Sequence, residues 1–499
     1  MKEIETICVV GGGSAGSLSA LTLKRLLPGR RVISVAAAGI PVIGVGESTT
    51  AYLPQFLHRQ LRLDQARFYR EVKPSWKLGI RFVWGPEERG HFNYPFAFDL
   101  SERVGNLRKR AGFYYRELGG EQGLMSALME SDKSVLMKDK GQYRMTNTPY
   151  GYHIDNARFL AWLSALAGEH GVEHVEGTIL ATEKDEAGDI TALKLDGDRR
   201  IEADLYIDCS GFKSLLLGQE MGAEFRSFAP ALRCDTAIVG DIPRKGAILP
   251  YTSAETMENG WCWKIELPER VSVGYVHSSS HIGLDEARAE LLAKNPALKE
   301  DGLRTIRFPS GRRESFWVGN VIGIGNASGF VEPLESTALH VICDELVFVA
   351  AALLDSDYRI EPAAVEDANQ SFRRLWDATR DFLTVHYKFN TRSDSAFWRE
   401  CRADTDLGGA EEIARLWGEV GPHVAMKNAL PQNTLVQMEG YLAMFIGMQV
   451  PTRQQSRFDD QDRQDWADLQ KQIAAATARA VPVREALSAV GRPSWRWGA

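Results

Sequence analysis

Two side chains that could take part in catalysis have mostly apolar neighbours in this sequence. Lys77 lies between Trp76 and Leu78, and Glu335 follows Leu334 directly. An ammonium group can donate hydrogen bonds to a developing electrophile or react as an amine, and a carboxylate can accept a proton from carbon. By spacing alone, the simpler interpretations are a solvated lysine on an edge strand and an acid favoured by a helix start.

The elements that would hold a cofactor begin at the N-terminus. A β-branched apolar run, 4–10, leads into Gly11-Gly12-Gly13-Ser14-Ala15-Gly16, then into a helical pattern over 17–27 and a strand over 31–35. A glycine turn between strand and helix lets a pyrophosphate approach backbone amides, so this unit predicts dinucleotide binding. The second strand ends in Ala36 and Ala37 where an acidic ribose partner is usual, which predicts modest affinity.

Later segments repeat this arrangement and suggest a mixed α/β fold. Apolar strands within 203–211 and 318–325 also run into glycine turns, so we expect three distant strands in one sheet. A helix is predicted over 159–167, a small antiparallel sheet from Val172 with turns near Gly188 and Gly197, and a long helix from near Ser336. After Leu354 the pattern is mostly helical.

Composition excludes several classes of protein. The 499 residues are 44% hydrophobic and 25% charged, with 59 basic and 66 acidic residues and a net charge of −7, which argues against a nucleic-acid partner. Six scattered cysteines without a Cys-x-x-Cys pair indicate neither a metal cluster nor a disulfide framework. With no signal peptide or membrane-length apolar run recognised, we expect a cytoplasmic protein without a membrane partner.

Several motifs together resemble the flavin-dependent halogenases of the tryptophan halogenase family. Two weaker matches also occur in family order, at Trp261-x-Trp263-x-Ile265 and at His386-Tyr387 with 392–398. The five stronger segments, spread over most of the chain, are the turn 11–16, Gly44-Val45-Gly46-Glu47-Ser48-Thr49, Trp76-Lys77-Leu78-Gly79-Ile80-Arg81-Phe82, Asp208-Cys209-Ser210-Gly211-Phe212 and Gly329-Phe330-Val331-Glu332-Pro333-Leu334-Glu335-Ser336-Thr337.

The resemblance implies a fold and a domain organisation. We expect an α/β protein with an FAD-binding module of the aromatic-hydroxylase type, containing a parallel sheet and antiparallel strands, over residues 1–360. Substrate-side segments would be inserted at roughly 90–150 and 220–310. A mostly helical subdomain over residues 361–499 would complete the substrate pocket, and a homodimer is compatible with this organisation.

The resemblance also implies the reaction. Reduced FAD, supplied by a separate flavin reductase, would react with O2 to give a flavin hydroperoxide that oxidises chloride or bromide to hypohalous acid. The oxidant would pass to Lys77 and halogenate a small, electron-rich, indole-like aromatic substrate. Glu335 would draw the proton from the ring or polarise the hypohalous acid.

Other residues take roles by the same resemblance. The halide would bind at Ser336, Thr337 and Ala338, and Trp261, Trp263 and Ile265 would form a wall between flavin and substrate. No metal site is expected. The residues expected to bind FAD are Gly11, Gly13, Ser14, Ala15, Gly16, Gly46, Glu47, Ser48, Gly325 and Leu334.

Two departures from the family pattern keep other functions open. Ala338 stands where the family usually has glycine, which could alter a backbone halide site, and Glu266 stands where proline is expected. The alternatives are an FAD-dependent aromatic monooxygenase that hydroxylates its substrate directly, and a flavin-binding protein without turnover. The sequence does not decide between chloride and bromide, or among free tryptophan, simple indoles, phenols, pyrroles and carrier-tethered substrates.

Overall fold

A six-stranded, mostly parallel sheet contains the N-terminal strand. The computed structural model describes residues 3–37, 39, 46–97, 123–454 and 458–497. All neighbours in this sheet are parallel except the last pair, which confirms that three distant strands share one sheet. Its order is β10 (Glu173–Glu176), β2 (Arg31–Ala36), β1 (Thr6–Val10), β14 (Leu205–Asp208), β23 (Val321–Gly323) and β22 (Trp317–Val318).

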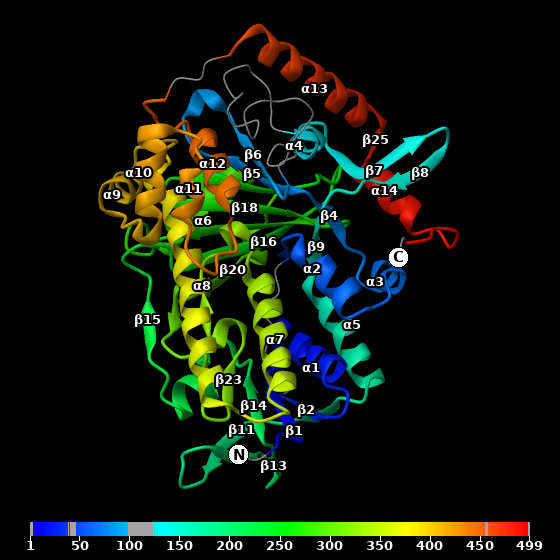
Figure 1. The fold of residues 1–499 in the computed structure, drawn as a ribbon, viewed down its shortest axis with the longest axis vertical. Coiled ribbons are helices and arrows are strands. Elements are labelled where there is room, and N and C mark those ends of the chain that lie inside the picture. The colour runs from blue at the N-terminus through cyan, green and yellow to red at the C-terminus, as the bar shows by residue number, and fades with distance from the viewer. Residues whose placement is uncertain (1–2, 38, 40–45, 98–122, 455–457, 498–499) are drawn as a thin grey trace.

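A seven-stranded sheet forms the second layer, and in Figure 1 it lies above the first. Its pairs are antiparallel except β17 with β5, which are parallel. The order is β20 (Arg304–Arg307), β16 (Thr236–Pro243), β19 (Arg270–His277), β18 (Gly260–Glu266), β17 (Thr252–Met257), β5 (Gly79–Val83) and β6 (Phe92–Pro95).

A short three-stranded sheet matters most for the site. Strand β9 (Gly151–Asp155) pairs in antiparallel fashion with β3 (Gly46–Ser48) on one side and with β4 (Ser75–Lys77) on the other. A Cβ atom on Gly151 would lie 2.6 Å from the Thr49 carbonyl oxygen, so only glycine permits this close approach opposite Lys77.

Three further small sheets complete the strands. The predicted antiparallel sheet is confirmed as β11 (Ile179–Lys184), β12 (Ile190–Leu195) and β13 (Arg200–Glu202). The expectation that the strand at Val172 begins this sheet is wrong, because β10 instead joins the large sheet parallel to β2. The others are β15 (Phe225–Ser227) with β21 (Gly311–Arg313) and β24 (Gly329–Phe330), and β25 (Ala480–Pro482) with β7 (Lys133–Asp139) and β8 (Gln142–Met145).

Helices cover the sheets and dominate the C-terminal region. Helix α1 (Ser14–Leu26) packs against α5 (Asn156–Glu169), which confirms the predicted helix over 159–167, and against α7 (Ala338–Asp355). The long α8 (Pro362–Phe389) lies beside α7 in Figure 1. The others are α2 (Tyr52–Gln55), α3 (Gln65–Glu71), α4 (Gly123–Glu130), α6 (Leu284–Lys294), α9 (Ala396–Asp404), α10 (Glu411–Val420), α11 (Ala425–Asn428), α12 (Met438–Gly447), α13 (Asp460–Arg479) and α14 (Val483–Val490).

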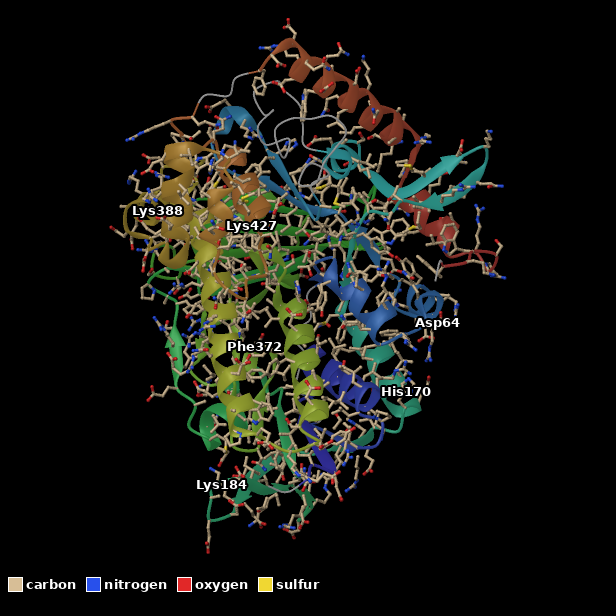
Figure 2. All side chains as sticks on the ribbon, in the orientation of Figure 1. Asp64, His170, Lys184, Phe372, Lys388 and Lys427 are labelled. Carbon is tan, nitrogen blue, oxygen red and sulfur yellow. The ribbon has the colours of Figure 1, made fainter. Side chains whose placement is uncertain are left out.

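One hydrophobic core extends across these layers. Phe372 of α8 stacks on Phe316 with ring centroids 4.3 Å apart, whereas the exposed Asp64 and Lys184 lie at the periphery (Figure 2). All six cysteines are buried and free. Among the described residues, no helix is both long enough and apolar enough to cross a membrane.

Candidate active site

The glycine turn after β1 is built by close backbone contacts. Gly11 has φ 128°, and a Cβ there would lie 2.3 Å from the Cys209 carbonyl oxygen. A Cβ on Gly16 would lie 1.9 Å from the Gly11 carbonyl oxygen, so strand and helix meet too closely for any side chain. A Cβ on Gly13, by contrast, would meet no atom within 4 Å. The turn is thus closely packed against backbone atoms at Gly11 and Gly16, and has open space beside Gly13.

A second glycine turn meets the first. Gly325 follows β23 with φ 65°, and a Cβ there would lie 3.2 Å from the Ala15 Cβ. The Gly325 amide donates to a Glu345 carboxylate oxygen at 2.8 Å, and the Ser328 hydroxyl donates to the other at 2.6 Å. Burial raises the pKa of Glu345 to about 8. Sequence analysis missed Glu345, although an acid within the apolar stretch of α7 was a visible signal.

Two other residues that are expected to bind the cofactor, Ser14 and Leu334, are held by neighbouring residues. The Ser14 hydroxyl donates to the Asn156 side-chain oxygen at 2.9 Å, which ties the start of α1 to the start of α5. Leu334 is buried beside Glu335. Because Ala36 ends β2, the strand edge beside the turn carries a methyl group where an acid is usual.

Strand β3 buries Gly46 and leaves Glu47 and Ser48 half-buried. A Cβ on Gly46 would lie 3.2 Å from a methyl carbon of Ile265, and the Ser48 hydroxyl is 2.7 Å from the Thr252 hydroxyl. Burial raises the pKa of Glu47 to about 7. Gly44 and Val45 of the same motif lie outside the described residues, as do 98–122 of the expected inserted segment 90–150.

Lys77 is fully buried at the end of β4, so the interpretation as a solvated lysine is wrong. Its Nζ donates to the Ser336 hydroxyl at 2.8 Å and lies 5.1 Å from the centre of the Phe96 ring. Burial lowers the pKa of Lys77 to about 7, although the nearby negative charge of Glu335 partly opposes that shift. Both the ammonium and the amine are therefore accessible near neutral pH.

Glu335 ends a short 3₁₀ turn, Pro333–Glu335, and its side chain is buried. One carboxylate oxygen lies 2.9 Å from Nε2 of His386, an ion-pair contact without the alignment of a hydrogen bond. His386 is itself fully buried on α8. Sequence analysis noted His386 within a motif but assigned it no role. The rings that surround it belong to Phe82, Trp84 and Phe382.

The expected halide-binding residues lie where the backbone changes conformation just before α7. Ser336 adopts the left-handed conformation with φ 58°, which is uncommon for serine, and Thr337 caps α7. The predicted long helix near Ser336 is confirmed, and it begins two residues later because left-handed backbone cannot continue a right-handed helix. Ala338 is the first helical residue and has no positive φ, so its methyl group imposes no backbone strain.

The expected wall lies on one face of β18. Trp261 and Trp263 have ring centroids 5.9 Å apart, and with Ile265 they pack in the main core, whereas Cys262 packs in a different cluster. A Cβ on Gly274 of the neighbouring strand would lie 2.0 Å from the Trp263 ring. The missing side chain at Gly274 therefore makes room for this indole.

Two buried glutamates have polar partners at or near this strand. Trp261 Nε1 donates to a carboxylate oxygen of Glu332 at 3.1 Å, and burial raises the pKa of Glu332 to about 7. Glu266, in the place of the expected proline, pairs with Arg244 at 2.6 Å. Removal of either Glu266 or Arg244 would leave the other charge buried without a partner, so each of these two residues requires the other.

Several of the predicted residues thus form two groups, each held together by contacts among its own members. Gly11, Gly16 and Gly325 meet at the edge of the six-stranded sheet, while Lys77 and Ser336 meet at the three-stranded sheet. The second group combines a cation near neutral pKa, a buried carboxylate and an aromatic ring. Such a set can polarise or accept an electrophile and remove a proton from carbon.

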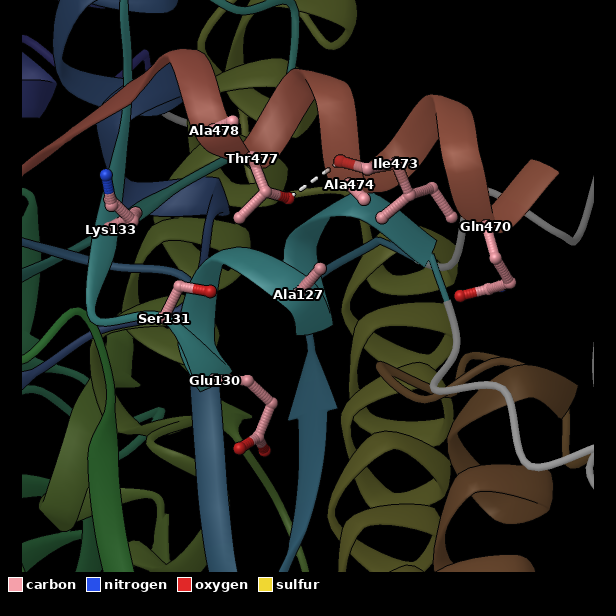
Figure 3. Close-up of a pocket in the computed structure, with 9 residues that line it drawn as sticks. All are labelled: Ala127, Glu130, Ser131, Lys133, Gln470, Ile473, Ala474, Thr477 and Ala478. Carbon is pink, nitrogen blue, oxygen red and sulfur yellow. Dashed lines mark hydrogen bonds between the residues drawn. The ribbon is translucent and has the colours of Figure 1, made fainter. Parts of the chain in front are cut away.

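Among the described residues, no three His, Cys, Asp or Glu side chains are grouped so as to hold a metal ion. A pocket of about 510 Å³ lies between α4 and α13 (Figure 3). It contains none of the predicted site residues, and is lined by Ala127, Glu130, Ser131, Lys133, Gln470, Ile473, Ala474, Thr477 and Ala478.

Comparisons with known proteins give matches over most of the chain. The family model described as tryptophan halogenase matches residues 6–463. The tryptophan 7-halogenase KtzQ of Kutzneria is 34% identical over 80% of this chain and 79% of its own, and the tryptophan 6-halogenase ThaL of Streptomyces albogriseolus is 32% identical over 83% and 81%.

Solved structures show the same likeness over nearly the whole chain. MibH, a lanthipeptide tryptophan 5-halogenase, superposes with a TM-score of 0.90 at 37% identity, covering 98% of this chain and 94% of its own. BrvH, a flavin-dependent halogenase from Brevundimonas, gives 0.87 at 28% identity, covering 98% and 99%.

Proposed function

Because the chain belongs to the tryptophan halogenase family, a family of flavin-dependent halogenating enzymes, we propose that Lys77 and Glu335 are its catalytic pair on an indole-like ring. The observation that carries this proposal is the burial of the two charged groups within electrostatic reach of each other. Residues 258 positions apart in sequence would not be placed so for stability, since buried charges are costly. Halogenation, rather than direct hydroxylation, is the activity that the relatives favour.

The residues of the glycine turn fit an FAD. Gly13 opens onto space free of protein atoms, while Gly11 and Gly16 hold the backbone of the turn tightly. When bound, reduced FAD supplies, with O2, the oxidising power that converts halide to hypohalous acid. Ser14, Ala15 and Gly325 would line the same turn, with Gly46, Glu47, Ser48 and Leu334 on the side toward Lys77. A separate flavin reductase would supply the reduced form.

Lys77 would hold the oxidant next to the substrate. Its ammonium has three N–H donors, of which one is used by Ser336, so the others are available to the oxygen of hypohalous acid. In its amine form, Lys77 would accept the halogen as a haloamine. A pKa near 7 makes both routes accessible without a large free-energy cost.

Glu335 would accept the ring proton after the halogen adds. Its carboxylate is buried against His386, so little water competes for the proton. Ser336, Thr337 and Ala338 would bind chloride or bromide through the first amides of α7, which have no acceptors within the helix. Trp261, Trp263 and Ile265 would separate the flavin from the organic substrate.

The substrate class follows from the relatives. Two curated relatives are named for tryptophan, and MibH is named for tryptophan in a lanthipeptide. We therefore propose an indole ring, carried either by free tryptophan or by a tryptophan residue in a peptide.

Product analysis tests the proposal. The protein would be incubated with FAD, a flavin reductase, NADH and either chloride or bromide, against free tryptophan, indole and a tryptophan-containing peptide. A product heavier by one halogen, with its isotope pattern, is expected from at least one substrate. An oxygenated product without halogen would instead establish the monooxygenase, and flavin binding with no product on any substrate would contradict both.

A further inference from the structure

A chain of hydroxyl groups leads from Lys77 to a buried histidine. Lys77 Nζ donates to the Ser336 hydroxyl at 2.8 Å, and Ser336 donates to the Ser48 hydroxyl at 3.0 Å. Ser48 lies 2.7 Å from the Thr252 hydroxyl, which lies 2.8 Å from Nε2 of His153. The chain therefore joins β4, β3, β17 and β9 to Ser336, two residues before α7.

Four of its five members lie almost entirely out of solvent, and Ser48 is half-buried. Lys77 and His153 are fully buried, and Ser336 and Thr252 are at most 5% exposed. Each hydroxyl has a single hydrogen, so in a chain of this kind the donor direction at one end fixes the direction at every step. Hydrogen bonds in such dry surroundings also polarise one another.

The direction is set at the His153 end. The Ser75 hydroxyl donates to the backbone oxygen of Glu266, so its only hydrogen is used. Nδ1 of His153 is 3.4 Å from the Ser75 oxygen. With its hydrogen used, the Ser75 oxygen can only accept, so the imidazole proton belongs on Nδ1. Nε2 therefore presents a lone pair to Thr252.

Burial, together with nearby positive charges, keeps His153 neutral. Burial and the positive charges of Lys77 and Arg244 lower the pKa of His153 well below its usual value, and only the Glu266 backbone oxygen opposes them. Arg244 is in turn paired with the Glu266 carboxylate. A neutral imidazole with its proton on Nδ1 is the form that the geometry requires.

The consequence for Lys77 follows step by step. Thr252 donates to His153, Ser48 to Thr252 and Ser336 to Ser48, so Ser336 offers only a lone pair to Lys77. A chain of opposite direction would instead aim the Ser336 hydrogen at Lys77 and favour the neutral amine.

We propose that His153 is a positioning residue for halogenation, which acts through Thr252, Ser48 and Ser336 to hold Lys77 as a hydrogen-bond donor. This inference rests on the proposed role of Lys77. With one N–H held by Ser336, the other two are free to donate to the oxygen of hypohalous acid. The groups facing Lys77 are then Glu335, which takes a proton, and Phe96, which does not titrate.

The transfer balances with these groups. The oxygen–halogen bond breaks with its electron pair on oxygen, and Lys77 protonates that oxygen to give water. The ring forms the carbon–halogen bond and loses its proton to Glu335. Lys77 is left as the amine and Glu335 as the acid, and one proton transfer between them restores the ion pair.

The test is a comparison of substitutions at one position. Thr252→Val breaks the chain, Thr252→Ser keeps the hydroxyl, and Thr256→Val removes a hydroxyl on the same strand that donates to the Val83 carbonyl instead. The cofactor-free protein, labelled with ¹⁵N-lysine, would be titrated by NMR, with the Lys77 signal assigned from Lys77→Met. His153→Leu is a second variant that removes the terminal lone pair.

Thr252→Val and His153→Leu should shift the Lys77 ammonium–amine balance toward the amine by about 3- to 10-fold, the range expected for one net hydrogen bond. The pH profile of kcat should move by the same amount while KM changes little, and the Ser variant and Thr256→Val should behave like the parent. If His153→Leu fails to fold, Thr252→Val carries the test. An unchanged Lys77 titration in the folded variants would overturn the proposal, whereas full halogenation by Lys77→Met would overturn the proposed function instead.

Discussion

The glycine turn and the Lys77 region differ in whether backbone or side chains form them. At the turn, the missing side chains of Gly11 and Gly16 allow close contacts between backbone atoms. A Cβ atom on Gly13 would meet no atom within 4 Å. At Lys77, a cation and the Glu335 carboxylate are buried with specific polar partners. The first region depends on the absence of side chains, and the second on the presence of particular ones. Substitutions should therefore affect binding in the first region and catalysis in the second.

The largest expected effect is at Lys77. Lys77→Ala should abolish halogenation while flavin reoxidation and hypohalous acid formation continue, because Lys77 acts after the oxidant forms. A chemical scavenger of free oxidant, added beside the organic substrate, measures the two steps separately. Loss of oxidant formation in this variant would place Lys77 at the flavin and contradict the division between the regions.

Glu335→Gln should slow halogenation by about 10²- to 10⁴-fold, since an amide cannot accept the ring proton. Rates on the true substrate give the loss, and thermal melts of both proteins exclude unfolding. The matched control is Glu314→Gln, which alters an acid that pairs with Arg312 at a partly exposed position. Parent-like activity of Glu335→Gln would reduce Glu335 to an acid at a helix start.

The charge at Lys77 should cost stability in a pH-dependent way. Because its folded pKa of about 7 lies below the unfolded value, the unfolded chain binds more protons between about pH 7 and 10. The penalty is therefore complete below pH 7 and fades as pH rises. Lys77→Met should raise the free energy of unfolding by roughly 3 kcal/mol at pH 6, allowing for the lost hydrogen bond, and by much less at pH 10.

Denaturant melts of parent and variant at both pH values measure this difference. Lys264→Met is the control, because Lys264 pairs with Glu255 at a partly exposed site. An equal change for Lys77→Met at both pH values would show that burial of the charge is not the cause.

The smallest effect is expected at the turn. Gly13→Val should weaken FAD binding by about tenfold or more, close to 1.4 kcal/mol, because its side chain fills space that the protein leaves open. Folding should be unaffected, since Gly13 has φ −82°. Fluorescence titration of flavin measures binding. Gly29→Val, which also meets no atom within 4 Å, should bind like the parent. Unchanged binding in Gly13→Val would mean that another surface holds the flavin.

Much of the turn could be predicted because its rules are local. Strand, glycine spacing and helix lie within Thr6–Leu26, and each follows from side-chain period or from backbone freedom. Alternation on β18 likewise predicted a shared face for Trp261, Trp263 and Ile265. The exact first residue of α7 could not be predicted, because the left-handed conformation of Ser336 has no signal in an ordinary Ser-Thr pair.

By itself the sequence determined the types of groups available: a glycine turn, a lysine in an apolar strand and a glutamate beside a proline. Only the tertiary structure decided that Lys77 meets Ser336, that Glu335 meets His386, and that both charges are buried. The physical reason is range. Period and backbone preference act over a few residues, whereas a pKa or a hydrogen bond between residues 259 positions apart depends on how whole sheets register and exclude water.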